Sequence, residues 1–225
     1  KNSFIFESVE KGKIRGRYTI IGFNPDKIFN IGKNKIVIDN FEKKKIIKTN
    51  TLHYLNDLIK NFKVKSSSQL PGMSSMLVGY FSYDVIRLIE KIPDSCKKDI
   101  NIPDIRLMRP KNLIIYDNLK KKIFYLCNVF SDTKISNYFD EYDNIQKEFK
   151  ILHFYGEISL PKKLTFKSNK NKIKSNITKK QFKNKVLKAK AYIKKGDIFQ
   201  VVLSQRFDRK FEKKPIEIYN YLRES

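Results

Sequence analysis

Cysteine is scarce in this sequence. Cys96 and Cys127 are the only two, they form no CxxC motif, and no Cys/His cluster accompanies them. This excludes a zinc site of the Cys/His type. Two scattered thiols suit a reducing compartment, so we expect a cytoplasmic protein.

Long apolar runs and nucleotide-binding glycine motifs are also missing. No run approaches the roughly 20 apolar residues that a membrane-spanning helix needs, and no signal peptide is visible. The sequence has no Walker loop and no GxGxxG motif. The two histidines, His53 and His153, have no nearby partner for a triad or a metal site, so each is interpreted as an ordinary surface or core residue.

Acidic residues are few relative to basic ones. The chain has 48 Lys and Arg against 23 Asp and Glu, which gives a formal net charge of +25. Such a charge suits a nucleic-acid or membrane-surface protein. However, most of the cations are Lys, which binds phosphate less specifically than Arg does, and they are spread along the whole chain. We therefore expect a lysine-rich surface that favours anionic small molecules, with no nucleic-acid partner and no membrane partner.

Residues 1–155 are predicted to form short strands and three helices. A strand is expected to stop at Asn24-Pro25-Asp26, and Gly32-Lys33-Asn34 predicts a hairpin turn. The predicted strands cover 3–7, 17–23, 27–31, 35–39, 76–81, 105–108, 112–116 and 122–129. Apolar spacing predicts helices over 51–63, with Thr51 as the N-cap, over 83–90 and over 134–154.

The stretch 156–176 lacks apolar periodicity and is rich in Lys, Asn and Ser, which predicts a linker. It would separate a domain over 1–155 from a second domain over 177–225. In the second domain Thr178 and Gln181 predict a capping box, Gly196 a helix stop, and Pro215 the first turn of another helix. Residues 198–207 are predicted to form a strand. This mixture of elements favours an α+β fold over a doubly wound sheet.

Three segments resemble the anthranilate synthase component I family, in the family's order. The segment GDIFQVVLSQRF at 196–207 resembles the opening of that family's chorismate-binding domain. The segments 6–10 with 15–22, and 79–84 with 87–90, resemble its N-terminal regulatory domain. The resemblance covers nearly the whole chain and implies packed antiparallel β-sheets with peripheral helices. It also implies that a chain running from Lys1, without Met, to Ser225 is a truncated, N-terminal fragment.

The resemblance implies an enzyme that converts chorismate and ammonia to anthranilate and pyruvate, the first step of tryptophan biosynthesis. It implies a glutamine amidotransferase subunit, anthranilate synthase component II, as the source of ammonia. It also implies Mg²⁺ that holds the substrate carboxylate. The family's metal ligands are expected beyond residue 225, so no residue of this chain is assigned to the metal. We expect the fragment alone to be inactive.

Gln200 is the candidate catalytic residue. Related enzymes that add water to chorismate carry a Lys at the corresponding position, which resembles a general base. A Gln side chain cannot take a proton from water at neutral pH, but it can orient ammonia by hydrogen bonds. The alternative is that Gln200 only hydrogen-bonds within a sheet.

Glu7 and Ser8 match a Glu-Ser pair with which this family binds tryptophan as a feedback inhibitor. A serine can hydrogen-bond the amino acid, and a glutamate can pair with its ammonium group. Arg17 is a looser candidate for the inhibitor's carboxylate, because the spacing in that loop varies across the family. The alternative is that these are ordinary polar residues at a sheet edge.

Two other functions are compatible with the sequence. The first is 4-amino-4-deoxychorismate synthase component I of the folate branch, which shares the fold and the amination step. The second is a basic, non-enzymatic binding protein, which would explain the charge but not the order of the three segments.

Overall fold

The computed structural model describes residues 2–10, 14–62, 67–95, 100–132, 142–147, 149–150, 173–210 and 214–224. Contacts between Cα atoms divide the chain into two units, Lys1–Ile158 and Ser159–Ser225. The predicted domain boundaries remain predictions, because most of the proposed linker lies outside the described residues.

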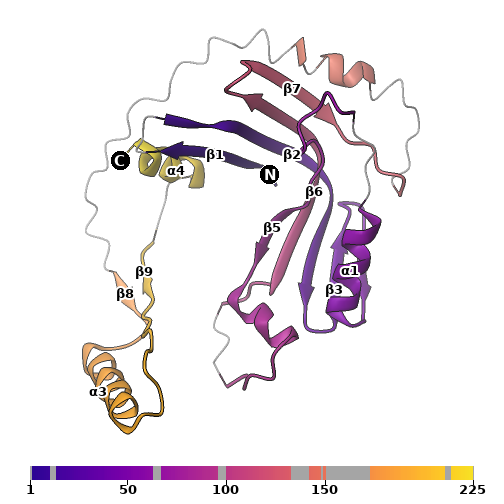
Figure 1. The fold of residues 1–225 in the computed structure, drawn as a ribbon. Helices are drawn as coiled ribbons and strands as arrows, with labels where there is room; N and C mark the ends of the chain where they lie inside the picture. The colour runs from indigo at the N-terminus through magenta and orange to yellow at the C-terminus, as the bar shows by residue number, and fades with distance from the viewer. Residues whose placement is uncertain are drawn as a thin grey trace. The chain divides into compact units, whose positions relative to one another are not determined.

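An antiparallel sheet of seven strands forms the first unit, counted over the described part of the chain. Its strands are β1 (Phe4–Glu10), β2 (Ile14–Gly32), β3 (Lys35–Asp39), β4 (Lys44–Ile47), β5 (Val78–Phe81), β6 (Ile105–Asp117) and β7 (Lys122–Cys127). Strands β2 and β6 pair along most of their length and form the bent centre of the sheet (Figure 1). On the edge of β2 away from β6, β1 pairs with the first part of the strand and β3 with the last part. On the edge of β6 away from β2, β5 pairs with the first part and β7 with the last part.

The sequence-based prediction of four short strands around two prolines was wrong. Pro25 lies opposite Pro110, and both are buried within the continuous strands β2 and β6. Neither proline has an N–H to donate to the ladder. The pairing instead shifts register between Pro25 and Lys27, and Asn24 adopts a positive φ of 47°. The prolines therefore mark a bulge and a bend in continuous strands.

Helix α1 (Thr51–Asn61) packs its apolar side on this sheet. Leu55 joins a buried cluster with Phe29, Ile31, Ile36, Ile105 and Leu107. The predicted helix is confirmed, but its N-cap is Asn50, whose side chain accepts a hydrogen bond from the His53 amide. Thr51 is buried, and its hydroxyl donates to the Gly32 carbonyl and accepts from the Asn34 amide, so it ties the helix to the β2–β3 turn.

The remaining elements of this unit agree in part with the sequence-based prediction. The predicted helix after β5 is a 3₁₀ helix, η1 (Tyr83–Leu88), and residues 142–147 and 149–150 of the predicted helix 134–154 are helical. The rest of that prediction lies outside the described residues. Strand β4 was missed, because its Lys-Lys-Ile-Ile sequence has no alternation of apolar and polar residues.

The second unit contains β8 (Lys174–Ser175), α3 (Lys179–Lys195), β9 (Phe207–Asp208) and α4 (Pro215–Glu224). The Thr178–Gln181 capping box is present, Gly196 ends α3 with a φ of 81°, and Pro215 begins α4, as predicted. The predicted strand 198–207 was wrong except at Phe207, because residues 198–206 have no regular secondary structure. No helix within the described ranges is long and apolar enough to cross a lipid bilayer.

Candidate functional site

Glu7, Ser8 and Arg17 lie on two neighbouring strands at an irregularity of the sheet. In the β1–β2 ladder Glu7 is paired with Thr19, and Val9 with Arg15. One residue of β1, Ser8, therefore lies opposite a three-residue stretch of β2, residues 16–18. The structure thus brings together the backbones of the three residues that the sequence singled out for inhibitor binding.

The side chain of Arg17 is held by a buried carboxylate. Its Nε and Nη2 atoms donate to Oδ2 of Asp117 at 3.4 and 3.2 Å. The Asp117 side chain is 3% exposed and the Arg17 side chain 46%. The guanidinium is therefore anchored on one edge while nearly half of the side chain remains open to solvent.

Asp117 also closes the turn that joins β6 to β7. Its Oδ1 atom accepts hydrogen bonds from the amides of Leu119 and Lys120, both at 3.0 Å. Burial by itself would raise the pKa of this carboxyl, but the Lys120 amide, the Arg17 guanidinium and the Leu119 amide hold the pKa below its usual value. Asp117 is therefore ionised at neutral pH.

Asn118 donates hydrogen bonds to two backbone carbonyls in the same stretch of β2. The Asn118 amide donates to the Arg17 carbonyl at 2.6 Å, and its Nδ2 atom donates to the Gly16 carbonyl at 2.8 Å. In the sequence, Asp117 and Asn118 fall between the predicted strands 112–116 and 122–129. Their contacts with Gly16 and Arg17, 100–102 positions earlier, depend on the β2–β6 register, and no local pattern signals that register.

Side chains of opposite charge come from the two strands at this irregularity. Arg17 presents a cationic group held by Asp117, of the kind that binds a carboxylate, and Glu7 on the adjacent strand is partly exposed and carries an anionic group, of the kind that pairs with an ammonium. Arg17 Nη1 has no hydrogen-bond partner within the described part of the chain, so it can donate to a ligand.

Gln200 lies in the second unit, in the irregular segment between α3 and β9. Its side chain is exposed, and it makes no hydrogen bond to any residue that the structure describes. The neighbouring Phe199 is 93% exposed and Val202 is 82% exposed. Gln200 is thus not buried in apolar packing, and its side chain is open to a ligand.

Within the described part of the chain, hydrogen bonds to residues 175 and 176 hold the end of this segment. Gln205 Nε2 donates to the Ser175 hydroxyl at 2.7 Å, and the Arg206 amide donates to Asn176 Oδ1 at 3.0 Å. The strand pairing then covers only Ser175 with Phe207 and Lys174 with Asp208. The apolar residues before Gln205 have the composition of a strand but no neighbouring strand in the described residues to supply the ladder bonds.

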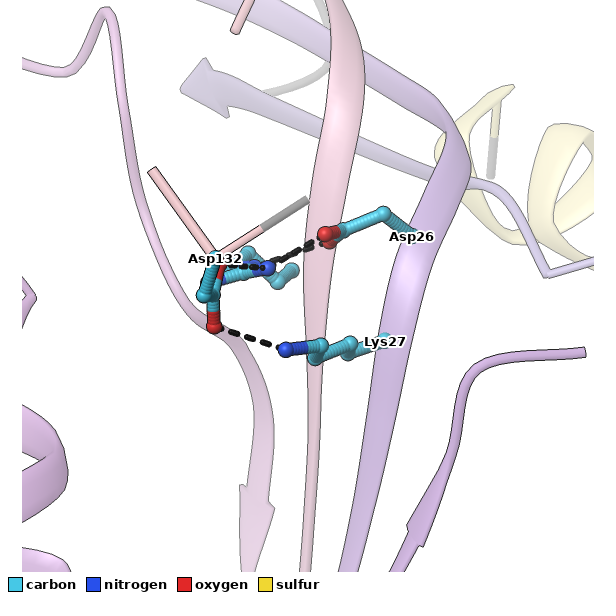
Figure 2. Close-up of polar contacts among 4 residues, drawn as sticks. Asp26, Lys27 and Asp132 are labelled. Carbon is cyan, nitrogen blue, oxygen red and sulfur yellow. Dashed lines mark hydrogen bonds and ion pairs between the residues drawn. The ribbon is translucent and has the colours of Figure 1, made fainter. Parts of the chain in front are cut away.

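A second group of charges lies at the proline bulge and was missed by the sequence analysis. Arg109, with a side chain 8% exposed, contacts Asp26, 10% exposed, through two hydrogen bonds. It also donates to Asp132 at 2.8 Å, and Lys27 contacts the same aspartate at 2.6 Å (Figure 2). The Arg109 guanidinium stacks on the Phe130 ring at 3.9 Å. Because Arg109 and Asp26 are both nearly buried, this pair is a structural contact that fixes the bend, while Asp132 lies at the solvent-exposed side of the cluster.

Burial would raise the pKa of Asp132, but hydrogen bonds and charges from Arg109 and Lys27 lower it to about 2. No group of three or more His, Cys, Asp or Glu residues within the described ranges could hold a metal ion. The expectation that the Mg²⁺ ligands lie beyond residue 225 remains a prediction.

Comparisons with known proteins agree with the sequence resemblance. The chain is 35% identical to anthranilate synthase component 1 of Acetivibrio thermocellus over 225 residues, which cover 98% of the chain and 46% of that protein. It is 33% identical to anthranilate synthase component 1 of Aquifex aeolicus, covering 98% of the chain and 45% of that protein. The chain therefore spans about half the length of the relatives that it matches.

The fold is also similar to a solved structure. The crystal structure of anthranilate synthase component I from Streptococcus pneumoniae TIGR4 superposes with a TM-score of 0.72 at 24% identity, over 96% of this chain and 47% of that one. This confirms the α+β fold with its antiparallel sheet and peripheral helices. A sequence profile described as chorismate binding enzyme matches residues 1–225, so the chain belongs to the family of chorismate binding enzymes.

Proposed function

We propose that this chain is part of anthranilate synthase component I, which converts chorismate and ammonia to anthranilate and pyruvate. The observation that carries the proposal is the GDIFQVVLSQRF segment, with an amide side chain at Gln200. Its support comes from relatives named anthranilate synthase component 1 that match along almost the whole chain. Because the chain spans about half of those relatives, the activity is proposed for the complete protein that carries it.

In this proposal Gln200 orients the nucleophile. Neutral ammonia needs no general base, so a side chain that only donates and accepts hydrogen bonds is sufficient. A lysine at this position would instead suit the activation of water. The exposed Gln200 amide has no hydrogen-bond partner among the described residues, so both its donors and its acceptor can serve a ligand.

The variant Gln200→Lys in the complete protein tests this role. We expect ammonium-dependent anthranilate formation to fall by roughly a hundredfold, because the nucleophile is misplaced. Gln69→Lys is the matched control, since Gln69 is an exposed loop residue of the first unit and gains the same charge. Unchanged activity in Gln200→Lys would refute the catalytic role.

We infer that the ammonia comes from a glutamine amidotransferase subunit, anthranilate synthase component II. The name "component 1" of the relatives implies a second component. Glutamine-dependent activity should therefore require the added subunit, whereas ammonium-dependent activity should not. Glutamine-dependent activity without a partner would contradict the inference.

The proposal includes Mg²⁺ as a Lewis acid on the substrate carboxylate, with ligands outside this chain. It also places the enzyme in the cytoplasm, on the ground of its scarce, scattered cysteines.

We further propose that tryptophan inhibits the enzyme by binding at Glu7, Ser8 and Arg17. The support is the family's Glu-Ser pair and the juxtaposition of these residues on β1 and β2. The variant Ser8→Leu should resist inhibition while the enzyme remains active, and Ser3→Leu, five residues earlier and exposed, should not. Inhibition of Ser8→Leu at wild-type tryptophan concentrations would refute the assignment.

A further inference from the structure

Asp117 and Asn118, where β6 turns into β7, make three contacts with the bulged stretch of β2. Asp117 holds the Arg17 side chain, and Asn118 holds the carbonyls of Arg17 and Gly16. All these contacts fall on the residues that lie opposite Ser8 in the β1–β2 ladder.

We propose that Asp117 and Asn118 are positioning residues of the inhibitor site, which set the affinity for tryptophan by fixing Arg17 and the bulge. This inference rests on the proposed inhibition by tryptophan. It assigns neither residue a direct contact with the inhibitor. The Asp117 side chain is 3% exposed, so it acts through the Arg17 guanidinium that it holds.

The two oxygens of Asp117 have separate tasks. Oδ1 accepts from the two turn amides, whereas Oδ2 accepts from both Arg17 nitrogen atoms. Substitution of Asp117 by asparagine can therefore keep the acceptor for the turn while it removes the acceptor and the charge that hold Arg17. This separates the positioning role from the folding of the turn.

Anchoring of Arg17 raises affinity because the ligand does not have to order a long side chain. A free arginine loses substantial rotamer freedom when it binds a carboxylate, and a pre-ordered one loses much less. The exposed part of the side chain, with Nη1, remains available to a ligand carboxylate. Asp117 therefore binds the Nε and Nη2 edge of the guanidinium and leaves Nη1 for the inhibitor.

Asn118 contributes by a different route. Its Nδ2 bond to the Gly16 carbonyl and its backbone bond to the Arg17 carbonyl hold the three-residue stretch away from regular pairing with β1. Loss of the Nδ2 bond would let the bulge move relative to Ser8. We expect a smaller effect than for Asp117, because the backbone bond remains.

The test is the dissociation constant of tryptophan, measured by calorimetry on the complete enzyme. Asp117→Asn should raise this constant by roughly tenfold, the scale of one charge-assisted hydrogen bond, and Asn118→Ala by about threefold. Asp84→Asn is the matched control, because it also removes a carboxylate from an arginine, Arg87, in η1. It should leave the constant unchanged.

A double-variant cycle separates positioning from general destabilisation. If Asp117 acts through Arg17, then Arg17→Gln and the double variant Arg17→Gln/Asp117→Asn should bind tryptophan equally weakly. Additive losses would overturn the inference. Should Asp117→Asn fail to fold, Asn118→Ala decides the question, and wild-type affinity in that variant would overturn the proposal.

Ser8→Leu distinguishes this inference from the proposed inhibition. Loss of binding in Ser8→Leu together with wild-type affinity in Asp117→Asn would overturn the positioning role alone. Wild-type affinity in Ser8→Leu, or no binding by the unaltered enzyme, would overturn both.

Discussion

Replacement of Arg109 by methionine should destabilise the seven-stranded sheet far more than replacement of Lys27 by methionine, although both cations contact Asp132. Arg109 is 8% exposed and contacts Asp26, which is 10% exposed, whereas Lys27 is 21% exposed and Asp132 is 53% exposed. Loss of one partner of a buried ion pair costs about 3–5 kcal/mol, since the other charge stays buried without its counterion. Loss of a pair that faces solvent costs about 0–1 kcal/mol.

Hydrogen exchange of peptides from β2 and β6, followed by mass spectrometry, measures this difference locally. Local exchange is preferable to a global melt because a chain of two units need not unfold in one step. Arg109→Met should speed exchange in these strands by at least about a hundredfold, which corresponds to roughly 3 kcal/mol. Lys27→Met should change it by less than about fivefold.

Equal effects of the two variants would show that the nearly buried Arg109–Asp26 pair stabilises the sheet no more than the exposed Lys27–Asp132 pair. A second check is the double variant Asp26→Leu/Arg109→Met, in which both buried charges are removed. It should be more stable than Arg109→Met alone, since no buried carboxylate is left behind.

Two further predictions concern acid stability and close backbone packing. Because the pKa of Asp132 is about 2 in the folded state and near 3.8 in the unfolded state, its stabilising contribution is present above about pH 4 and is lost as the pH falls toward 2. Allowing for its half-exposed position, we expect about 1 kcal/mol, measured as a weaker pH dependence of unfolding in Asp132→Asn over this range. A Cβ atom at Gly79 would lie 1.7 Å from the Arg106 carbonyl oxygen, so Gly79→Ala should cost at least about 3 kcal/mol in urea unfolding. Gly72→Ala, where no atom lies within 4 Å, should change stability by less than about 0.5 kcal/mol, and comparable losses in both variants would contradict this argument.

Features of the fold that depend on a few adjacent residues were predictable from the sequence. The Thr178 capping box, the Gly196 helix stop and the start of α4 at Pro215 are all present, because each requires only local backbone and side-chain groups. The hairpin between β2 and β3 is confirmed for the same reason.

Features that depend on neighbours distant in sequence were not predictable. Pro25 was expected to end a strand, but it lies opposite Pro110 in a ladder where neither residue has a hydrogen to donate. Residues 198–206 have strand-like composition, yet strand pairing also requires an adjacent strand, which only Phe207 and Asp208 have in β8.

In the candidate site, too, individual residues were predictable but their arrangement in space was not. The sequence pointed to Glu7, Ser8 and Arg17 individually, through a resemblance. Their common position depends on the β1–β2 register shift. The anchoring of Arg17 by Asp117 joins residues 100 positions apart, and only the β2–β6 register brings them together.

We propose that the complete protein carrying this chain aminates chorismate and releases pyruvate. The most direct measurement supplies the purified protein with chorismate, Mg²⁺ and ammonium, and follows anthranilate by its fluorescence together with pyruvate. The two products should form in equal amounts. Formation of 4-amino-4-deoxychorismate without pyruvate, or no consumption of chorismate, would contradict it.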